Sequence, residues 1–395
     1  MTGTAWLCEP FRTPFTRAGK GALSGARSDD LLATLFRHLA GAGSKAAAID
    51  EVIVGCAYPE GEQGRNVARA VTLGAGLPDA VPAMTVTRLC ASSLEAIAIA
   101  CDRVRLGEAD LVLAGGMESM TGIPLGGANP SPNLLWSTVR PDIYIRMGET
   151  AERVARAHRV SRADQDAWAL RSHARADAAR RAGVFAEEIV PVVTPMTPAM
   201  VGSSGGTPYA AMAQVCEDDS IRPDTSAEKL AALKPAFAAD GSVTAGNACP
   251  TSDGASALIV ASTAAVERHG LRPLGRFVAY AVAGVDPALM GIGPIAAVPR
   301  ALERAGLPLA AMDRIELNEA FASQVVAVVR GLGLPEERTN VNGGAIALGH
   351  PLGASGARLA GTLLRELLRC GGRYGLATLC VGGGMGAAMV VERTA

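Results

Sequence analysis

The sequence predicts an α/β fold made of two similar halves with a loop-rich segment between them. Stretches with strand and helix patterns alternate along the chain, which is typical of this fold class. Residues 71–119 and 329–386 repeat one order: a GLP turn, an apolar strand, a Cys or His, a long helix, a glycine turn, a second strand and a run of glycines. Residues 120–245 differ, with Pro/Gly/Ser-rich loops around an Arg/Ala-rich helix at 161–183.

Composition narrows the possible functions. The 395 residues carry a net charge of −1, so a basic surface for nucleic acid is not expected. No apolar run reaches the roughly 18 residues of a membrane span, and the first residues lack the pattern of a secretory signal. The 8 cysteines are scattered without a CxxC pair, which argues against a metal site and a disulfide framework. We therefore expect a cytoplasmic protein without a membrane or nucleic-acid partner.

In the first repeat, Cys90 stands just before a predicted helix. The predicted strand MTVTR precedes it, and apolar positions with helical spacing follow. Ser92 and Glu95 fit a Ser-x-x-Glu capping box, so the helix should begin at about Ser92. The positive end of the helix dipole would stabilise a thiolate and lower the thiol pKa from about 8.5. Cys90 is thus a candidate nucleophile, and a small buried apolar residue is the alternative.

His350 occupies the matching place in the second repeat. The other 4 histidines lie in stretches with helical spacing, whereas His350 lies in the glycine-rich segment NGGAIALGHPLGASG. A helix should follow from about Ser355 to Cys370, where Gly371 and Gly372 end it. Equivalent helices would bring Cys90 and His350 to one end of the fold, where the imidazole could accept the thiol proton. A structural turn histidine is the alternative.

Cys380 is the third candidate. It ends the predicted strand YGLATLCV, before the turn GGGMG, which needs backbone of positive φ, and a further strand. A cysteine at this place could donate a proton, and the N–H of Gly382 could stabilise an oxyanion. A buried strand cysteine is the alternative. Residues 202–206 formally fit the G-x-S-x-G motif of serine hydrolases, but they lie between loop sequences rather than between a strand and a helix.

Together these segments resemble the thiolase family along nearly the whole chain. The most specific segments are VTRLCASS at 86–93, ELNEAFASQ at 316–324, NGGAIALGHPLGASGAR at 342–358 and CVGGGMG at 380–386. The resemblance implies a five-layered α-β-α-β-α fold of two βαβαβαββ halves, and a homodimer or homotetramer. We expect residues 1–119 with 243–266 to form the first half, 120–242 an inserted loop subdomain, and 267–395 the second half.

The resemblance also implies catalytic roles. Cys90 would accept the acyl group and His350 would be its base. Cys380 would be the acid and base for the acetyl-CoA enolate. Asn318 would hold a water that forms one oxyanion hole with His350, and the N–H groups of Cys90 and Gly382 would form the other.

The implied reaction is CoA-dependent cleavage of a 3-ketoacyl-CoA into acetyl-CoA and a shortened acyl-CoA, or its reversal, through an acyl-Cys90 intermediate. Coenzyme A is then a co-substrate and no bound cofactor is expected. By the same resemblance, Met147, Met290 and Phe321 line the acyl end of the site, Arg222 contacts a CoA phosphate, and Cys249 adjoins the pantetheine path.

Two segments, IRPDTSAEKL and MGIGP, favour the degradative 3-ketoacyl-CoA group of the family. Three alternatives remain: a biosynthetic acetoacetyl-CoA thiolase, a non-catalytic acyl-CoA-binding relative and a serine hydrolase. Arg146 stands before Met147 where acetoacetyl-CoA thiolases commonly have His, and Cys249 stands where Ser is common, so the acyl chain length stays open.

Overall fold

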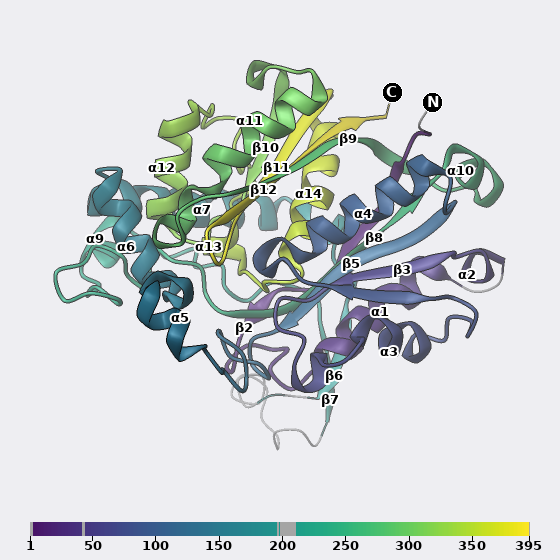
Figure 1. Ribbon diagram of the computed structural model, residues 1–395, viewed down its shortest axis with the longest axis horizontal. Coiled ribbons are helices and arrows are strands. Elements are labelled where there is room, and N and C mark those ends of the chain that lie inside the picture. The colour runs from purple at the N-terminus through teal and green to yellow at the C-terminus, as the bar shows by residue number, and fades with distance from the viewer. Residues whose placement is uncertain (1–2, 42–43, 196, 198–210, 395) are drawn as a thin grey trace.

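A computed structural model describes residues 3–41, 44–195, 197 and 211–394 (Figure 1). Within these ranges, no helix is both long and apolar enough to cross a bilayer. The segment 202–206, with its G-x-S-x-G pattern, lies outside the described residues.

One ten-stranded sheet organises the molecule, in the order β10-β11-β12-β9-β1-β8-β5-β3-β4, with β2 beside β8. Its strands are β1 (Trp6–Arg12), β2 (Thr16–Arg17), β3 (Glu51–Gly55), β4 (Ala83–Val86), β5 (Leu111–Ser119), β8 (Ser252–Ala261), β9 (Pro273–Gly284), β10 (Met312–Leu317), β11 (Tyr374–Val381) and β12 (Met385–Arg393).

The sheet contains the predicted duplication. The order β1-β8-β5-β3-β4 of the first half corresponds to β9-β12-β11-β10 in the second, where a single bridge between Ile315 and Thr339 takes the place of β4. The pairing directions also correspond. Strand β5 pairs in parallel with β3, as β11 does with β10. Strand β5 pairs antiparallel with β8, as β11 does with β12. The halves join through antiparallel pairing of β1 with β9, in which Trp6 faces Arg276.

Helices on both sides of each half complete five layers, as predicted. The outer helices are α1 (Ser28–Ala40) and α3 (Val67–Gly74) on the first half, and α11 (Gly293–Ala305) and α12 (Ala322–Leu332) on the second. Two central helices, α4 (Ser92–Leu106) and α14 (Ser355–Cys370), lie between the halves (Figure 1). Alternate residues of each strand serve the two faces. In β8, Ile259 packs in the core under α1, whereas Val260 packs in the central core.

Small residues let the central helices approach their neighbours. A Cβ on Gly356 would lie 2.5 Å from the backbone nitrogen of Leu94, so α14 contacts α4 directly. The hydroxyl of Ser93 accepts a hydrogen bond from the N–H of Ala357 at 2.9 Å. The direct contact at Gly356 therefore brings the starts of the two central helices together, along with the residues just before them.

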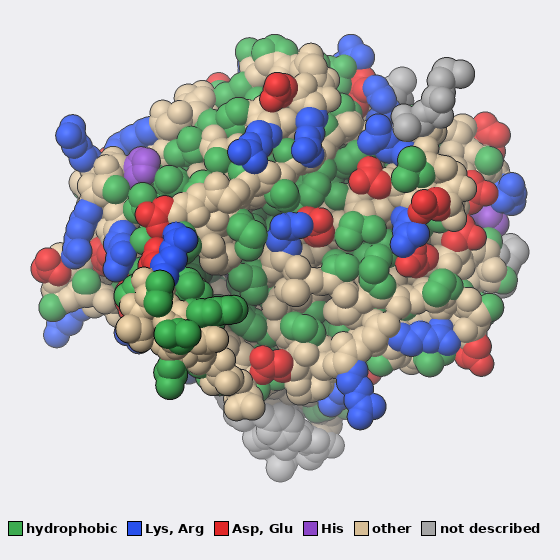
Figure 2. Space-filling view, viewed as in Figure 1, with side chains coloured by type: hydrophobic (Ala, Val, Ile, Leu, Met, Phe, Trp, Pro, Cys, Tyr) green, Lys and Arg blue, Asp and Glu red, His purple; other side chains and the backbone are tan. Residues whose placement is uncertain are grey.

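The segment between β5 and β8 has its own elements: α5 (Leu134–Val139), α6 (Met147–Ala157), α7 (Arg162–Arg181), β6 (Val192–Pro195), β7 (Met212–Val215) and α9 (Ala227–Ala231). Shorter helices elsewhere are α2 (Ser44–Ala47), α10 (Thr263–His269) and α13 (Ala345–Leu348). The predicted helix at 161–183 is α7, capped by Ser161 and Asp164. Apolar side chains gather on the surface at α5 (Figure 2), where Leu134 and Val139 are 79% and 78% exposed.

Candidate active site

Cys90 lies in a one-turn 3-10 helix, η2 (Leu89–Ala91), between β4 and α4. Leu89 has a φ of +44°, a conformation that a branched residue adopts only when its surroundings hold it there. The turn packs against Gly382, where a Cβ would lie 2.8 Å from the Leu89 side chain. Because Gly382 has no side chain, its N–H can approach the Cys90 sulfur closely and donate a hydrogen bond to it. The sulfur also accepts a hydrogen bond from the N–H of Cys90 itself.

The helix starts at Ser92 as predicted, but the capping box is wrong. The Ser92 hydroxyl accepts from the N–H of Arg88 and donates to the carbonyl of Leu89, so it closes the 3-10 turn. The Glu95 carboxylate forms an ion pair with Arg88 and accepts a hydrogen bond from Tyr280. The N-cap residue is Ala91, without a side-chain cap.

The prediction of a lowered Cys90 pKa is also wrong. Burial raises the pKa of the Cys90 thiol to about 11, the nearby Glu118 carboxylate adds to this rise, and the N–H of Gly382 opposes it. Desolvation of the thiolate therefore outweighs the helix dipole. At neutral pH Cys90 is a thiol, so it needs a base to become a nucleophile.

His350 is buried and hydrogen-bonded through both ring nitrogens. Ser355 Oγ lies 2.6 Å from Nδ1, and its single proton goes to the carbonyl of Pro351 at 2.9 Å. Nδ1 must therefore carry a proton and donate it. Asn318 Nδ2, which can only donate, lies 3.2 Å from Nε2. These partners assign the tautomer with an unprotonated Nε2.

Burial and the positive charge of Arg358 lower the pKa of His350 to about 3. The imidazole is thus neutral at physiological pH and keeps a lone pair on Nε2. The backbone N–H of His350 donates to Ser252 Oγ at 3.1 Å, which holds the loop. Leu352, two residues further, packs with Cys90 and Met120 in one apolar cluster. The predicted nucleophile and base therefore lie on segments that pack together.

Asn318 follows β10 and is fully buried. Its backbone N–H donates to the carbonyl of Thr378 on β11 at 2.9 Å. Its Oδ1 is buried and has no hydrogen-bond partner among the described residues. A buried amide oxygen of this kind costs about 1–3 kcal/mol when left unpaired, so it favours a hydrogen-bond donor beside His350.

Three thiols share this site. Cys380 pairs with Gly386 at the end of β11, and the turn behind it has Gly383 and Gly384 at φ of +76° and +79°, as the glycine run predicts. Burial raises the pKa of Cys380 well above its usual range, and Cys90 and Cys249 raise it further. Burial and Cys90 likewise raise the pKa of Cys249 to about 12. All three sulfurs are therefore protonated at neutral pH and close enough to influence one another.

The predicted acyl-binding residues form one apolar cluster. Met147, Met290 and Phe321 pack with Cys380, together with Ala151, Val243, Ala248 and Ala320. Met147 opens α6 and Met290 lies in the 3-10 helix η5 (Pro287–Ile292), so the inserted segment and the second half both contribute. Met147 Sδ lies 3.8 Å from the position of a Cβ on Gly382, beside the Cys90 turn.

Arg222 lies in the inserted segment and contacts His173, with Nη2 3.2 Å from Nε2. Burial and Arg222 lower the pKa of His173 to about 4, so the pair carries one positive charge. The acidic residues considered as partners have other cations: Asp218 binds Arg12, Asp219 binds Arg17 and Asp224 binds Lys229. None of the ion pairs in the described ranges joins Arg222 to a carboxylate.

Sequence reasoning missed several residues that hold this site. Ser355 fixes the His350 tautomer, and a serine at a helix start five residues after the histidine was the available signal. Glu118 is buried and accepts the N–H groups of Ala57, Tyr58 and Gly353, which clamps the loops on either side of Cys90. Within the described ranges, no group of three potential ligands could hold a metal ion.

Two family models match the chain: "Thiolase, N-terminal domain" over residues 7–264 and "Thiolase, C-terminal domain" over residues 271–393. The 3-ketoacyl-CoA thiolase of Bacillus subtilis is 48% identical, over 96% of this chain and 97% of that protein. The β-ketoadipyl-CoA thiolase of Escherichia coli is 47% identical, over 98% and 99%. The crystal structure of human mitochondrial 3-ketoacyl-CoA thiolase superposes with a TM-score of 0.88 at 39% identity, covering 100% of this chain and 99% of that one.

Proposed function

We propose the chemistry of the site from the premise that this chain belongs to the thiolase family, an acyltransferase family whose models and relatives span nearly all of it. The reaction is thiolysis of a 3-ketoacyl-CoA to acetyl-CoA and an acyl-CoA two carbons shorter. The observation that carries the proposal is the neutral His350 with a lone pair on Nε2, in the same buried site as the protonated thiols of Cys90 and Cys380.

The first step transfers the acyl group to the enzyme. Because Cys90 is protonated at rest, proton transfer to His350 Nε2 accompanies attack of the sulfur on the 3-keto carbon. The bond between carbons 2 and 3 then breaks, and its electrons form the enolate of acetyl-CoA. Asn318 and His350 would stabilise this enolate through a water bound at the amide.

Cys380 completes the first half-reaction. Its thiol keeps its proton at neutral pH, so it can protonate carbon 2 of the enolate and release acetyl-CoA. In the second half-reaction, the Cys380 thiolate accepts the proton of a new CoA thiol as the CoA sulfur attacks the thioester on Cys90, and the His350 imidazolium returns its proton to the departing Cys90 sulfur. The N–H groups of Cys90 and Gly382, which converge on the sulfur, would stabilise the tetrahedral oxyanion and release the shortened acyl-CoA.

Thiolysis of acetoacetyl-CoA tests this proposal, because loss of the enolate absorbance follows the cleavage directly. Intact mass after incubation with an acyl-CoA should show one acyl group, and peptide mapping should place it on Cys90. Cys90→Ala should abolish both. A chain that binds acyl-CoA without turnover would support the non-catalytic alternative, and inactivation by a serine-directed phosphonate with Cys90 unmodified would support the hydrolase.

A second candidate substrate is a 3-ketoacyl-CoA with a terminal carboxylate. Relatives from Escherichia coli and Pseudomonas aeruginosa are named β-ketoadipyl-CoA thiolases. A groove of about 550 Å³ has a lining that includes Arg153 and Arg146, the residue that precedes Met147 in the sequence. Glu149 pairs with Arg146, whereas Arg153 has no acidic partner among the ion pairs in the described ranges.

The charge of this groove is mixed, since Asp142 and Asp286 also line it. The test compares 3-ketoadipyl-CoA with 3-ketohexanoyl-CoA, which has the same chain length without the charge. If Arg153 binds the carboxylate, Arg153→Gln should lower kcat/KM for the first substrate and leave the second unchanged. A higher kcat/KM for 3-ketohexanoyl-CoA in the wild type would favour an uncharged acyl chain and a role in fatty acid degradation.

For CoA, we propose that Arg222 contacts a phosphate, because it is exposed and lacks a carboxylate partner in the described ranges.

We also propose a homodimer or homotetramer. Strand β4 is the edge of the sheet, and the apolar side chains of α5 are exposed, so both suit a subunit contact. Light scattering measures the number of subunits in the assembly.

Three thiols in one site suit a reducing compartment such as the cytoplasm, and cell fractionation tests this proposed location.

A further inference from the structure

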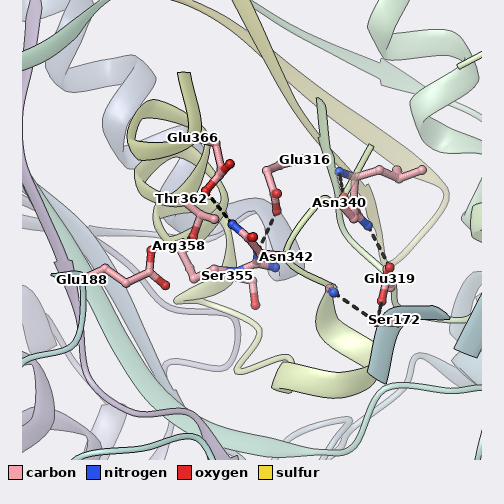
Figure 3. A network of polar contacts seen from close by, with 12 residues as sticks. Ser172, Glu188, Glu316, Glu319, Asn340, Asn342, Ser355, Arg358, Thr362 and Glu366 are labelled. Atoms are coloured by element: carbon pink, nitrogen blue, oxygen red, sulfur yellow. Dashed lines mark hydrogen bonds and ion pairs between the residues drawn. The ribbon is translucent and has the colours of Figure 1, made fainter. Parts of the chain in front are cut away.

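A buried ion pair lies behind His350. Arg358 on α14 and Glu316 on β10 approach to 2.9 Å between Nη1 and Oε2, and their side chains are 1% and 3% exposed (Figure 3). Neither residue belongs to the reaction steps above. Taking two charges out of water costs free energy that can exceed their mutual attraction, so a gain in stability alone does not account for this buried pair.

The ion pair connects the two elements that carry the catalytic contact. Glu316 precedes Asn318 by two residues at the end of β10, and Arg358 follows Ser355 by three residues on α14. Ser355 holds His350 at Nδ1, and Asn318 contacts Nε2 at 3.2 Å. The bond between Glu316 and Arg358 (Figure 3) therefore joins β10 to α14 close in sequence to Asn318 and Ser355, the two residues that contact the imidazole.

Other charged groups surround the pair. Glu188 accepts a hydrogen bond from Thr362 on α14, one turn beyond Arg358, and also binds Arg12. Glu319 follows Asn318; it accepts a hydrogen bond from Trp168, and it accepts two more from Ser172 and Asn340 (Figure 3). Glu118 lies on the Cys90 side of His350, bound to the N–H of Gly353. The thiols of Cys90, Cys249 and Cys380 are protonated, so Arg358 is the cation that acts on the imidazole.

We propose that Glu316 and Arg358 are positioning residues of the thiolase reaction: their ion pair fixes His350 against Asn318 and keeps the Arg358 charge screened while the imidazole carries the Cys90 proton. This inference rests on the proposed roles of Cys90 and His350. It assigns a function to two residues that touch no substrate.

The inference has a consequence for pH. Burial raises the pKa of Glu316, the charge of Arg358 opposes this rise, and Glu188 and Glu319 add to it, so that the resulting pKa is about 7. Above this pKa Glu316 is ionised and screens Arg358. Below it the carboxyl is neutral, and the unscreened guanidinium disfavours the imidazolium that forms during acylation. Acylation should therefore slow as the pH falls through about 7, although His350 itself, with its pKa near 3, stays neutral.

The experiment measures acylation of Cys90 in a single turnover with saturating acyl-CoA, as a function of pH. If loss of the Glu316 charge changes the pKa of the His350 imidazole by one unit, the rate of Cys90 acylation should fall by about threefold to tenfold as the pH falls through this step. Glu316→Gln should remove the step and leave the rate at its low-pH value throughout. The matched control is Glu366→Gln, the same change on α14 at a carboxylate that binds Asn342 and should keep the wild-type profile. A wild-type step in Glu316→Gln would overturn the proposal.

Two further measurements cover the case in which Glu316→Gln does not fold. Arg358→Lys keeps the positive charge, so the pH step should remain. The different shape of the lysine side chain should lower the acylation rate at every pH. Loss of the step in a folded Arg358→Lys would count against the proposal. In wild-type protein with labelled histidine, only 5 imidazole signals are expected. The His350 signal should shift with a midpoint near pH 7 without reaching the imidazolium position. A flat signal, or full protonation at that midpoint, would refute the inference.

The proposed function fails in a different way. If Cys90 is not the acyl acceptor, the wild type gives no acyl-Cys90 mass at any pH. If Cys90 is acylated but Glu316 plays no part, the acyl-enzyme forms and Glu316→Gln has the same pH profile as the wild type. The two failures are therefore separated by the mass of the wild-type acyl-enzyme.

Discussion

Removal of the Ser355 hydroxyl tests the tautomer of His350. Ser355 Oγ accepts the Nδ1 proton at 2.6 Å, and both residues are buried. In Ser355→Ala, Nδ1–H would be an unpaired buried donor, which costs about 1–3 kcal/mol. The imidazole can avoid this cost by moving its proton to Nε2, where a rotated Asn318 amide offers Oδ1. The base then carries a proton on the nitrogen that should accept one.

The magnitude follows from the cost of the productive tautomer. With a tenfold change in rate for about 1.4 kcal/mol, a penalty of about 1–3 kcal/mol lowers the rate of Cys90 acylation by about fivefold to 150-fold. The KM for acyl-CoA should change little, because Ser355 lies behind the imidazole. Stopped-flow acylation followed by thiolysis of acetoacetyl-CoA measures both quantities.

The matched control is Ser93→Ala at the start of the other central helix. Ser93 accepts the N–H of Ala357 at 2.9 Å, so its loss also leaves a buried donor unpaired and should lower the melting temperature. It has no contact with His350 and should keep the acylation rate. If Ser355→Ala acylates at the wild-type rate, the tautomer assignment is wrong. If both variants lose the same activity, the effect comes from the packing of α4 and α14.

Four further predictions concern the other site residues. Cys380→Ser should still acylate Cys90 from a plain acyl-CoA, seen by intact mass, but lose thiolysis by about 10²-fold or more, because only cleavage needs a carbon acid; equal loss of both would exclude this role. Iodoacetamide should label the exposed Cys216 and Cys370 without loss of activity, and inactivation through Cys90 should accelerate as the pH rises toward its pKa of about 11. Arg222→Ala should raise the KM for CoA severalfold at nearly constant kcat, and a pantetheine thioester without the nucleotide should show no difference. Met147→Phe should reduce kcat/KM for long acyl chains more than for acetoacetyl-CoA, and an unchanged chain-length profile would remove Met147 from the acyl site.

The sequence predicted the features that depend on neighbouring residues. The helix from Ser355 to Cys370 was found with its bounds, because Gly371 supplies the left-handed residue that ends it. The duplicated order of strands and central helices was visible because each half repeats the same turn, strand and helix. The family resemblance then added the candidate site residues, and the structure groups Met147, Met290 and Phe321 beside Cys380.

Features that depend on distant segments were not predicted. The helix dipole suggested a lowered pKa for Cys90. The pKa is raised instead, because chain segments far along the sequence, including those of Leu352 and Gly382, exclude solvent from the thiol. The ion pair of Glu316 with Arg358 spans 42 positions and exists only because α14 lies against β10. Ser92 and Glu95 matched a capping pattern, but the left-handed Leu89 and the charge of Arg88 gave both side chains other partners.

The place of β1 in the sheet has a consequence for synthesis. This strand is made well before both of its neighbours, β8 and β9, which come from the second part of the chain. At translation rates of about 5–20 residues per second, the roughly 250 residues between β1 and β8 take on the order of 10–50 s to make. During that time the ribosome-bound chain has a strand with two unpaired edges. The first half can therefore close its sheet only when β8 has emerged, and the two halves join only when β9 follows.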